Sequence, residues 1–143
     1  MHQLYLEKIQ ATNFRNLNHD IIEFSHGINC IFGLNGNGKT NILEAVNYLL
    51  NKKSFRKNTN FQQLINVECE QPEIVFSSVL TDENTNIFSY TGKLKSDQNI
   101  WYLNNEPTKR KLALNSIFIN PFDSFSFHNL SAFRRQWIDS HLS

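Results

Sequence analysis

The stretch that most constrains how this chain can fold is residues 28–40, which read INCIFGLNGNGKT. An apolar run leads into a glycine-rich loop. The P-loop spacing G-x-x-x-x-G-K-[ST] is satisfied by Gly33, Gly38, Lys39 and Thr40. Glycines let the backbone adopt conformations that other residues avoid, so that successive N–H groups can surround an anionic oxygen. We therefore expect a buried strand over residues 28–32 that runs into a phosphate-binding loop.

The residues that follow this loop have the spacing of an amphipathic helix. Apolar side chains recur at i, i+3, i+4, i+7 and i+8, at Ile42, Ala45, Val46, Leu49 and Leu50. A helix that starts here directs its positive end at the loop, where it favours bound anions. Lys39 can add a charge for the outer phosphates of a nucleotide, and the Thr40 hydroxyl can bind Mg²⁺. The order of strand, loop and helix predicts a nucleotide site. The simpler alternative is a glycine turn that binds nothing.

The composition is that of an ordinary globular domain. The chain has 143 residues, enough for one domain with a hydrophobic core, and it contains 12 Phe residues. Its formal net charge of +1 gives no information about nucleic acid or membrane partners. We expect no signal peptide and no membrane span, since no apolar run approaches the required length. Cys30 and Cys69 lack metal-ligand spacing and are expected to be buried thiols in a reducing cytoplasm.

Short apolar runs separated by polar turns predict strands around the P-loop, with an antiparallel meander over residues 73–103. Besides residues 28–32, the expected strands cover residues 4–9, 21–24, 74–80, 86–94, 99–103 and 116–120. The first two should form a hairpin, because too few residues separate them for a crossover connection. Asn104 and Asn105 are expected to end the meander, and Pro107 to block its continuation. Helical segments are expected over residues 61–65, over residues 109–114 after a Thr108 cap, and from Ser131 onward.

Four basic residues surround one phenylalanine after the P-loop helix. They are Lys52, Lys53, Arg56 and Lys57, with Phe55 between them. One interpretation is a contact with the phosphate backbone of DNA, with Phe55 as an anchor. The other is a solvated helix end, where positive side chains complement the negative pole of the helix. The spacing alone favours the solvated helix end.

Four stretches together resemble the RecF family of DNA repair and recombination ATPases, which are related to the ABC-type heads of SMC-like proteins. They are Asn13-Phe14-Arg15-Asn16-Leu17, the loop Gly33-Leu34-Asn35-Gly36-Asn37-Gly38-Lys39-Thr40, the run Lys53-Ser54-Phe55-Arg56, and Ile119-Asn120-Pro121-Phe122-Asp123 followed by Phe133-Arg134-Arg135-Gln136-Trp137-Ile138-Asp139. The Asn-Gly pair inside the loop is more specific than a bare P-loop. The spacing of all four stretches is similar to that of the family, so the resemblance covers nearly the whole chain.

The resemblance implies an α/β fold of the P-loop NTPase type, the N-terminal part of an ABC-ATPase-like head, with an inserted antiparallel β meander and short helices. Residues 1–60 would form the nucleotide-binding core, and residues 61–143 an antiparallel β and helical part. ATP and Mg²⁺ are the implied cofactors. Arg15 and Asn16 become candidates for contact with the nucleotide, in addition to the eight loop residues. The resemblance also strengthens the DNA interpretation of the four basic residues.

Such a family membership implies an ATP-gated protein that binds junctions between single-strand and double-strand DNA in the cytoplasm. It would act in replication, repair, recombination and the SOS response, and promote recombinase loading at gaps. The implied partners are DNA, recombination mediator proteins of the same pathway and, in the full-length form, a second copy in an ATP-dependent homodimer. No membrane partner is expected.

The chain also departs from the family pattern. It contains neither a signature motif nor a downstream Walker B pair, so we expect it to cover only the N-terminal part, and whether it hydrolyses ATP stays open. Asp82 and Glu83 imitate Walker B residues, but they precede a polar turn and are interpreted as hairpin residues. Two alternatives remain: a nucleotide-binding fragment without catalysis, and the head of an SMC-like or OLD-type ATPase.

Overall fold

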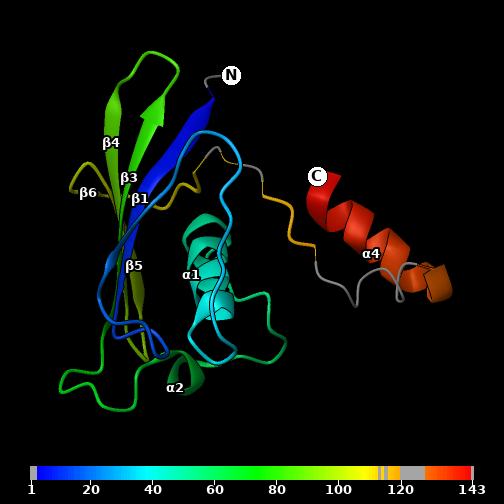
Figure 1. Ribbon diagram of the computed structural model, residues 1–143, viewed down its shortest axis with the longest axis horizontal. Helices are drawn as coiled ribbons and strands as arrows, with labels where there is room; N and C mark the ends of the chain where they lie inside the picture. The colour runs from blue at the N-terminus through cyan, green and yellow to red at the C-terminus, as the bar shows by residue number, and fades with distance from the viewer. Residues whose placement is uncertain (1–2, 113, 115, 120–127, 143) are drawn as a thin grey trace.

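One antiparallel sheet of six strands forms the framework of the computed structural model, which describes residues 3–112, 114, 116–119 and 128–142. The strand order is β2-β1-β3-β4-β5-β6 (Figure 1). The strands are β1 (Leu4–Thr12), β2 (Ile21–Glu23), β3 (Ile74–Asp82), β4 (Ile87–Leu94), β5 (Asn99–Leu103) and β6 (Glu106–Pro107). The helices include α1 (Lys39–Asn51), α2 (Phe61–Leu64) and α4 (Ser131–Leu142). The predicted nucleotide-binding core, residues 1–60, and the predicted second part, residues 61–143, therefore contribute strands to the same sheet.

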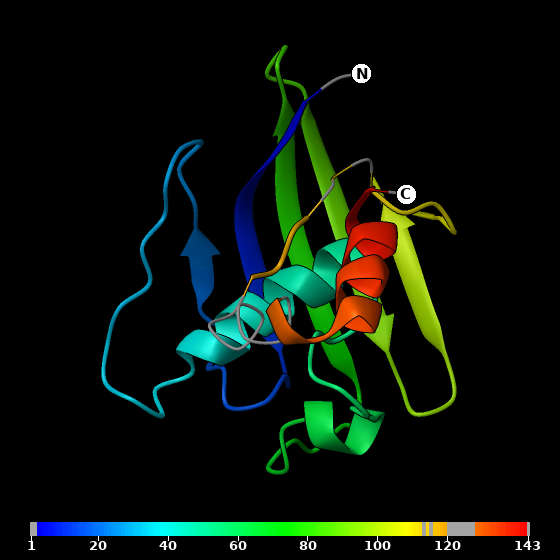
Figure 2. The same ribbon diagram turned by 90° about the vertical axis from the view of Figure 1, so that its right-hand side faces the viewer.

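The hydrophobic core lies between this sheet and α1, which lies against one sheet face in both views (Figures 1 and 2). Along β3, buried residues alternate with partly exposed ones, as expected for a strand with one face on a core. Tyr48 of α1 stacks on Phe76 of β3 with ring centroids 5.5 Å apart, and Phe14 meets the same ring edge-on at 5.0 Å. These ring contacts join the residues before β2, the helix and the centre of the sheet.

Most of the predicted elements are confirmed. The strands predicted over residues 4–9, 21–24, 74–80, 86–94 and 99–103 correspond to β1 to β5. β1 and β2 pair antiparallel, as their short connection requires. The helical turn at residues 61–65 is α2, which begins with reciprocal hydrogen bonds between Asn60 and Gln63. Helix α4 begins at the predicted Ser131.

The buried side of α1 differs in part from the predicted one. Ala45 and Leu49 are buried as expected, but Glu44 and Tyr48 are buried beside them. The other predicted positions, Ile42, Val46 and Leu50, are only partly buried. The side of the helix that meets the sheet thus carries a carboxylate, which the apolar spacing could not indicate.

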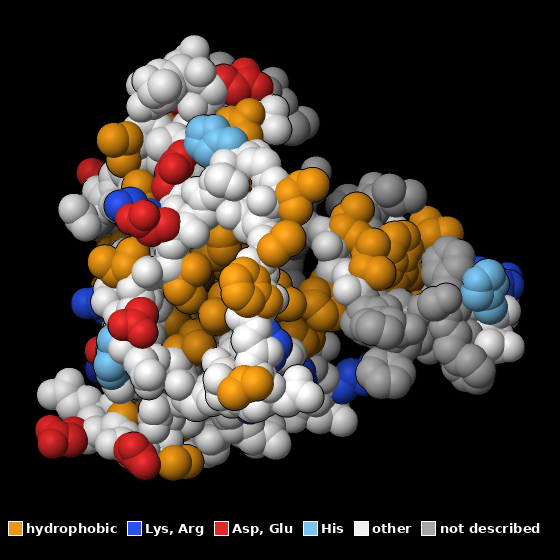
Figure 3. Space-filling model, in the orientation of Figure 1, with side chains coloured by type: hydrophobic (Ala, Val, Ile, Leu, Met, Phe, Trp, Pro, Cys, Tyr) orange, Lys and Arg blue, Asp and Glu red, His pale blue; other side chains and the backbone are white. Residues whose placement is uncertain are grey.

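The strand predicted over residues 28–32 is absent from the structure. Ile28 and Phe32 are 93% and 91% exposed, and Cys30, expected to be a buried thiol, is exposed. The Asn29 side chain bonds only to nearby groups, namely the backbone and hydroxyl of Ser25 and the Gly27 carbonyl oxygen. Among the described residues no strand pairs with this segment, so its backbone has no ladder to join. Figure 3 shows hydrophobic side chains gathered on the face that the segment crosses.

The predicted helix over residues 109–114 is not formed in its described part. Residues 109–112 have no helical turn. Instead of capping a helix, the Thr108 hydroxyl accepts a hydrogen bond from the Arg110 N–H at 3.1 Å, which closes a local turn. Residue 113 lies outside the described residues.

The predicted strand over residues 116–120 is also wrong within its described part. Residues 116–119 join no sheet, and Ile117 and Ile119 are 58% and 73% exposed. The segment lies apart from the sheet, so its apolar, β-branched composition finds no neighbouring strand. Residues 120–123 of the predicted family-like block lie outside the described residues.

Pro107 does not end the sheet, contrary to the prediction. Asn104 and Asn105 both have positive φ angles, 50° and 67°, and turn the chain back in a tight hairpin. Pro107 then pairs with Tyr102 of β5 in the short strand β6. A proline is tolerated here because β6 lies at the edge of the sheet, where its missing N–H interrupts no inner ladder.

Gly92 provides a test of how tightly the sheet packs. A Cβ atom added to Gly92 would lie 2.5 Å from the ring of Trp101, which is 5% exposed. We expect Gly92→Ala to displace this ring and to lower the free energy of unfolding by about 1–3 kcal/mol. Urea unfolding followed by tryptophan fluorescence measures the change. Gly27→Ala, which meets no atom within 4 Å, is the matched control and should unfold like the parent chain.

Candidate nucleotide-binding site

The glycine-rich loop adopts the backbone conformations that its sequence predicts. Gly36 and Gly38 both have φ angles of 85°, which side chains with a Cβ rarely adopt. Lys39 folds back over the loop, and its amine donates hydrogen bonds to the Gly33 and Leu34 carbonyl oxygens at 2.7 and 2.6 Å. The charge of Lys39 is therefore held at the place where the loop would surround an anion.

Helix α1 begins at this loop with an open N-terminus. Its N-cap residue is Gly38, no side chain caps it, and no acidic residue lies in its first turn. The first N–H groups of such a helix have no partner within the helix and favour an anion. A cavity of about 260 Å³ lies at this point, lined by Asn35, Gly36, Gly38, Lys39, Thr40, Asn41 and Arg56. Loop residues, helix start and one arginine thus meet around a single space.

Arg15, predicted to approach a nucleotide, forms a bidentate ion pair with the buried carboxylate of Glu44. Its Nε and Nη2 atoms donate to the two Glu44 side-chain oxygens at 3.0 and 2.9 Å. The Glu44 side chain is fully buried, and that of Arg15 is 18% exposed. A paired geometry of this kind gives strong, well-directed hydrogen bonds. Arg15 thereby joins the segment after β1 to the buried side of α1.

The same carboxylate also holds the segment that follows α1. The Ser54 hydroxyl donates to Glu44 Oε1 at 2.5 Å, and Arg56 Nη1 lies 3.4 Å from Oε2. Arg56 Nη2 in turn donates to the Asn41 side-chain oxygen at 2.9 Å. Glu44 therefore sets where Arg56 lies at the edge of the cavity.

Asn16, the other predicted neighbour of the nucleotide, contacts the loop directly. Its side-chain amide donates to the Gly36 carbonyl oxygen at 3.3 Å, and its side-chain oxygen accepts from the Asn41 amide at 2.6 Å. Asn16 thus connects the segment after β1 to the middle of the phosphate-binding loop and to the first turn of α1. The sequence motif placed Asn16 near the site, whereas Asn41 and Glu44 were not predicted.

The four predicted DNA-binding residues divide into two pairs. Lys52 and Arg56 contact other side chains of the chain. The Lys52 amine lies 5.2 Å from the centre of the Trp101 ring, and Arg56 contacts Glu44 and Asn41. Burial, with a smaller effect of Lys111, lowers the pKa of Lys52. Lys53 and Lys57 are exposed. Within the described part of the chain, neither Lys53 nor Lys57 has an ion pair or side-chain hydrogen bond.

Asp82 shapes a turn, as its interpretation from sequence indicated. One Asp82 side-chain oxygen accepts from the N–H groups of Asn84 and Asn86, each at 2.9 Å, and the other accepts from the Asn86 side chain. These bonds close the connection between β3 and β4. Asp82 does not line the cavity at the glycine-rich loop.

The comparison with known proteins agrees with the motif. Residues 5–123 match the RecF/RecN/SMC N terminal domain. The chain belongs to this family. A DNA replication and repair protein RecF of Carboxydothermus hydrogenoformans is 30% identical over 98% of the chain, and one of Francisella tularensis subsp. mediasiatica is 32% identical over 92%. The chain spans 39% and 38% of the lengths of these two RecF proteins.

Two solved RecF structures resemble the chain in three dimensions. One is described as the recombination mediator protein RecF with ATP in the RecFOR pathway; it has 26% sequence identity and a TM-score of 0.76 over 98% of this chain. A RecF complex with an ATP analogue has 27% identity and a TM-score of 0.79 over 95%. The chain spans 39% and 37% of those two chains. Within the described residues of this RecF-family chain, no helix is long and apolar enough to cross a membrane.

Proposed function

We propose that the chain is the N-terminal, ATP-binding part of a RecF-type DNA repair protein. The observation that carries the proposal is the cavity where the loop, the uncapped start of α1, Lys39 and Arg56 meet. The positive features are the start of α1, Lys39 and Arg56. Among the described residues, no acidic side chain lines the cavity that they share. Such an environment suits the phosphates of a nucleotide. The likeness to RecF structures with ATP and an ATP analogue supports this nucleotide.

Each residue of the loop has a role in this proposal. The N–H groups of the loop and of the first turn of α1 bind phosphate oxygens, and Lys39 exchanges its carbonyl partners for the outer phosphates. Thr40, in the first turn of α1, lines the cavity and offers one hydroxyl ligand to Mg²⁺, which takes its other ligands from water and phosphates. Asn16 holds the Gly36 carbonyl group, and Arg15 fixes Glu44. Direct contact of Arg15 with the nucleotide stays a prediction.

The wider activity belongs to the full-length protein. In this proposal that protein binds junctions between single-strand and double-strand DNA in an ATP-gated manner, forms an ATP-dependent homodimer in the cytoplasm and promotes recombinase loading with mediator proteins. The basic residues after α1 provide phosphate contacts. The names of the RecF relatives and the RecFOR description of a structural neighbour support this assignment.

A second candidate function is nucleotide binding without hydrolysis by this chain. Hydrolysis needs a group that orients water and stabilises the metal, commonly a carboxylate. None of the described residues that line the cavity is acidic, and Asp82 is occupied in its turn. This observation favours binding without turnover by the chain alone.

Calorimetric titration with MgATP, paired with a phosphate-release assay, tests the proposal. We expect binding of one nucleotide per chain and no phosphate release. A folded chain that binds no MgATP would contradict the assignment of the site. Phosphate release that persists in purified protein and is lost in Lys39→Ala would contradict the second candidate and assign turnover to this chain.

A further inference from the structure

We infer that the cleft between residues 52–59 and helix α4 binds a single-stranded segment of DNA. In this arrangement Lys53 and Lys57 contact phosphates and Trp137 contacts a base. The inference rests on the proposed function, because it assigns to one cleft the single-stranded arm of the junction.

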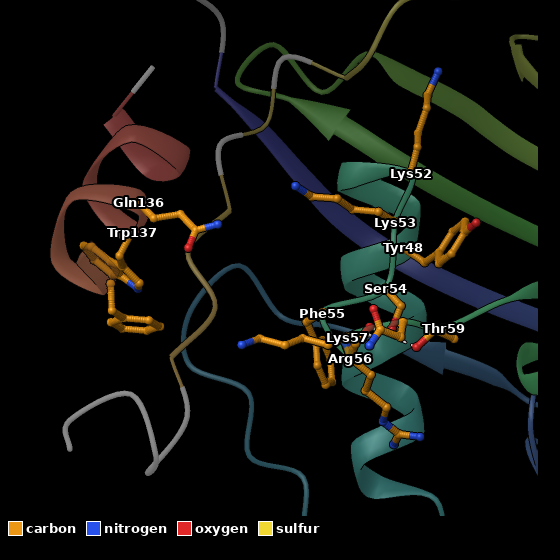
Figure 4. Close-up of a pocket in the computed structure, with 12 residues that line it drawn as sticks. Tyr48, Lys52, Lys53, Ser54, Phe55, Arg56, Lys57, Thr59, Gln136 and Trp137 are labelled. Atoms are coloured by element: carbon orange, nitrogen blue, oxygen red, sulfur yellow. Dashed lines mark hydrogen bonds between the residues drawn. The ribbon is translucent and has the colours of Figure 1, made fainter. Parts of the chain in front are cut away.

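The cleft has the size of a ligand site and brings together distant parts of the chain. Its volume is about 610 Å³, within the range of pockets that hold small molecules. One wall is the segment after α1, and the other comes from Phe133, Gln136 and Trp137 of α4. Figure 4 shows the Lys53 and Lys57 amines directed toward the side of the cleft where Gln136 and Trp137 lie.

The charge of the cleft suits a polyanion. Its first wall consists of residues 52–59 together with Tyr48 of α1, and no acidic residue lines the cleft among the described residues. Arg56 is paired with Glu44, and Lys52 lies over the Trp101 ring. Lys53 and Lys57 are exposed and have no acidic partner within the described part of the chain. Two positive charges are therefore available to neighbouring phosphates.

The aromatic side chains distinguish a single strand from a duplex. Phe133 and Trp137 are only partly buried in the cleft, and Phe55 stacks on Phe118 with ring centroids 4.0 Å apart. Bases of a single strand are open to stacking on such rings, and this stacking tolerates any sequence. In a duplex the base faces are covered by neighbouring bases. A surface that binds only the duplex phosphate backbone therefore has no need of aromatic side chains. The Gln136 amide can also bond to an unpaired base edge.

Tryptophan fluorescence gives a direct test, because the chain has only two tryptophans. Trp101 is 5% exposed and does not line the cleft, whereas Trp137 does, so a base that stacks in the cleft is expected to quench Trp137. Titration of the whole chain with oligo-dT should quench the emission, and the quenching should be absent in Trp137→Phe. The double variant Lys53→Gln/Lys57→Gln should weaken binding by roughly tenfold and reduce the slope of log K against log salt by about 1.4.

The matched control is Lys95→Gln, which removes an exposed charge paired with Glu73 outside the cleft. It should bind oligo-dT like the parent chain. Unchanged binding in the Lys53/Lys57 double variant, or tighter binding to duplex than to oligo-dT with no quenching, would overturn the inference. MgATP calorimetry on the same samples separates the two proposals. A chain that shows oligo-dT quenching but binds no MgATP contradicts the nucleotide assignment and supports the DNA-binding cleft. A chain that binds MgATP but shows no oligo-dT quenching contradicts the DNA-binding cleft alone.

Discussion

Replacing Lys39 with alanine is expected to weaken MgATP binding by about 100-fold or more. The Lys39 amine already lies at the loop, within 2.7 Å of the Gly33 and 2.6 Å of the Leu34 carbonyl oxygen. Hydrogen bonds between ionised groups contribute about 1.5–3 kcal/mol each, and alanine removes every bond that this amine can donate to phosphates. Calorimetric titration of the variant measures the loss.

Lys8→Ala is the matched control for Lys39→Ala. It removes the same charge from an exposed pair with Glu23 on the sheet, at 2.7 Å, and should leave ATP affinity unchanged. Urea unfolding of both variants shows whether the fold is kept. A folded Lys39→Ala chain with parental affinity would mean that the glycine-rich loop is a turn without a ligand, the alternative that the sequence left open.

The sheet could be predicted from sequence because its information is local. For β3, an apolar and β-branched run followed by a polar turn was enough to indicate a strand, although the alternation of burial does not follow residue type: Ser78 is buried and Val79 is only partly buried. The short polar turns allow only antiparallel neighbours for β3, β4 and β5. Asn104 and Asn105 end β5 as predicted, but their positive φ angles turn the chain back into a hairpin, and Pro107 pairs at the sheet edge instead of blocking continuation.

Residues 28–32 show what local information leaves out. An apolar, β-branched run indicates that a segment is suited to a strand, but not whether a partner strand lies beside it. The described residues supply no partner, and Ile28 and Phe32 stay exposed. The glycine pattern of the following loop was more informative, because glycine is the residue type that readily adopts the positive φ angles found at Gly36 and Gly38.

The polar network at the site was only half predictable. The family-like motif identified Arg15 and Asn16, whereas Arg56 was predicted as a DNA contact and not as a residue that lines this cavity. Glu44, which joins them, is separated from Arg15 by 29 positions and from Ser54 by 10. No rule of sequence spacing connects residues so far apart. The helical pattern was drawn from apolar residues alone, so it assigned Glu44 to the solvent-facing side of the helix. One available signal was its position directly before the predicted core residue Ala45.

Replacing Glu44 with alanine is expected to lower the free energy of unfolding by about 3–5 kcal/mol. The Glu44 side chain is fully buried and accepts hydrogen bonds from Arg15 and Ser54, with Arg56 nearby. Alanine would leave the Arg15 guanidinium, only 18% exposed, without its counter-charge. Glu44→Gln should cost less, because the amide keeps the shape and one acceptor oxygen. Urea unfolding followed by Trp101 fluorescence measures both.

Glu23→Ala is the control for Glu44→Ala, because the Glu23 side chain is 68% exposed and its pair with Lys8 lies in solvent. It should unfold like the parent chain, whereas a Glu44→Ala chain with parental stability would show that the buried pair is dispensable.

Glu44→Gln also tests the role of Glu44 at the nucleotide cavity. Since Glu44 holds Arg56 at the edge of the cavity, Glu44→Gln should weaken MgATP binding in the parent chain but have little further effect in an Arg56→Gln background. Equal losses in both backgrounds would mean that Glu44 influences the loop without Arg56, through Arg15 and the segment after β1.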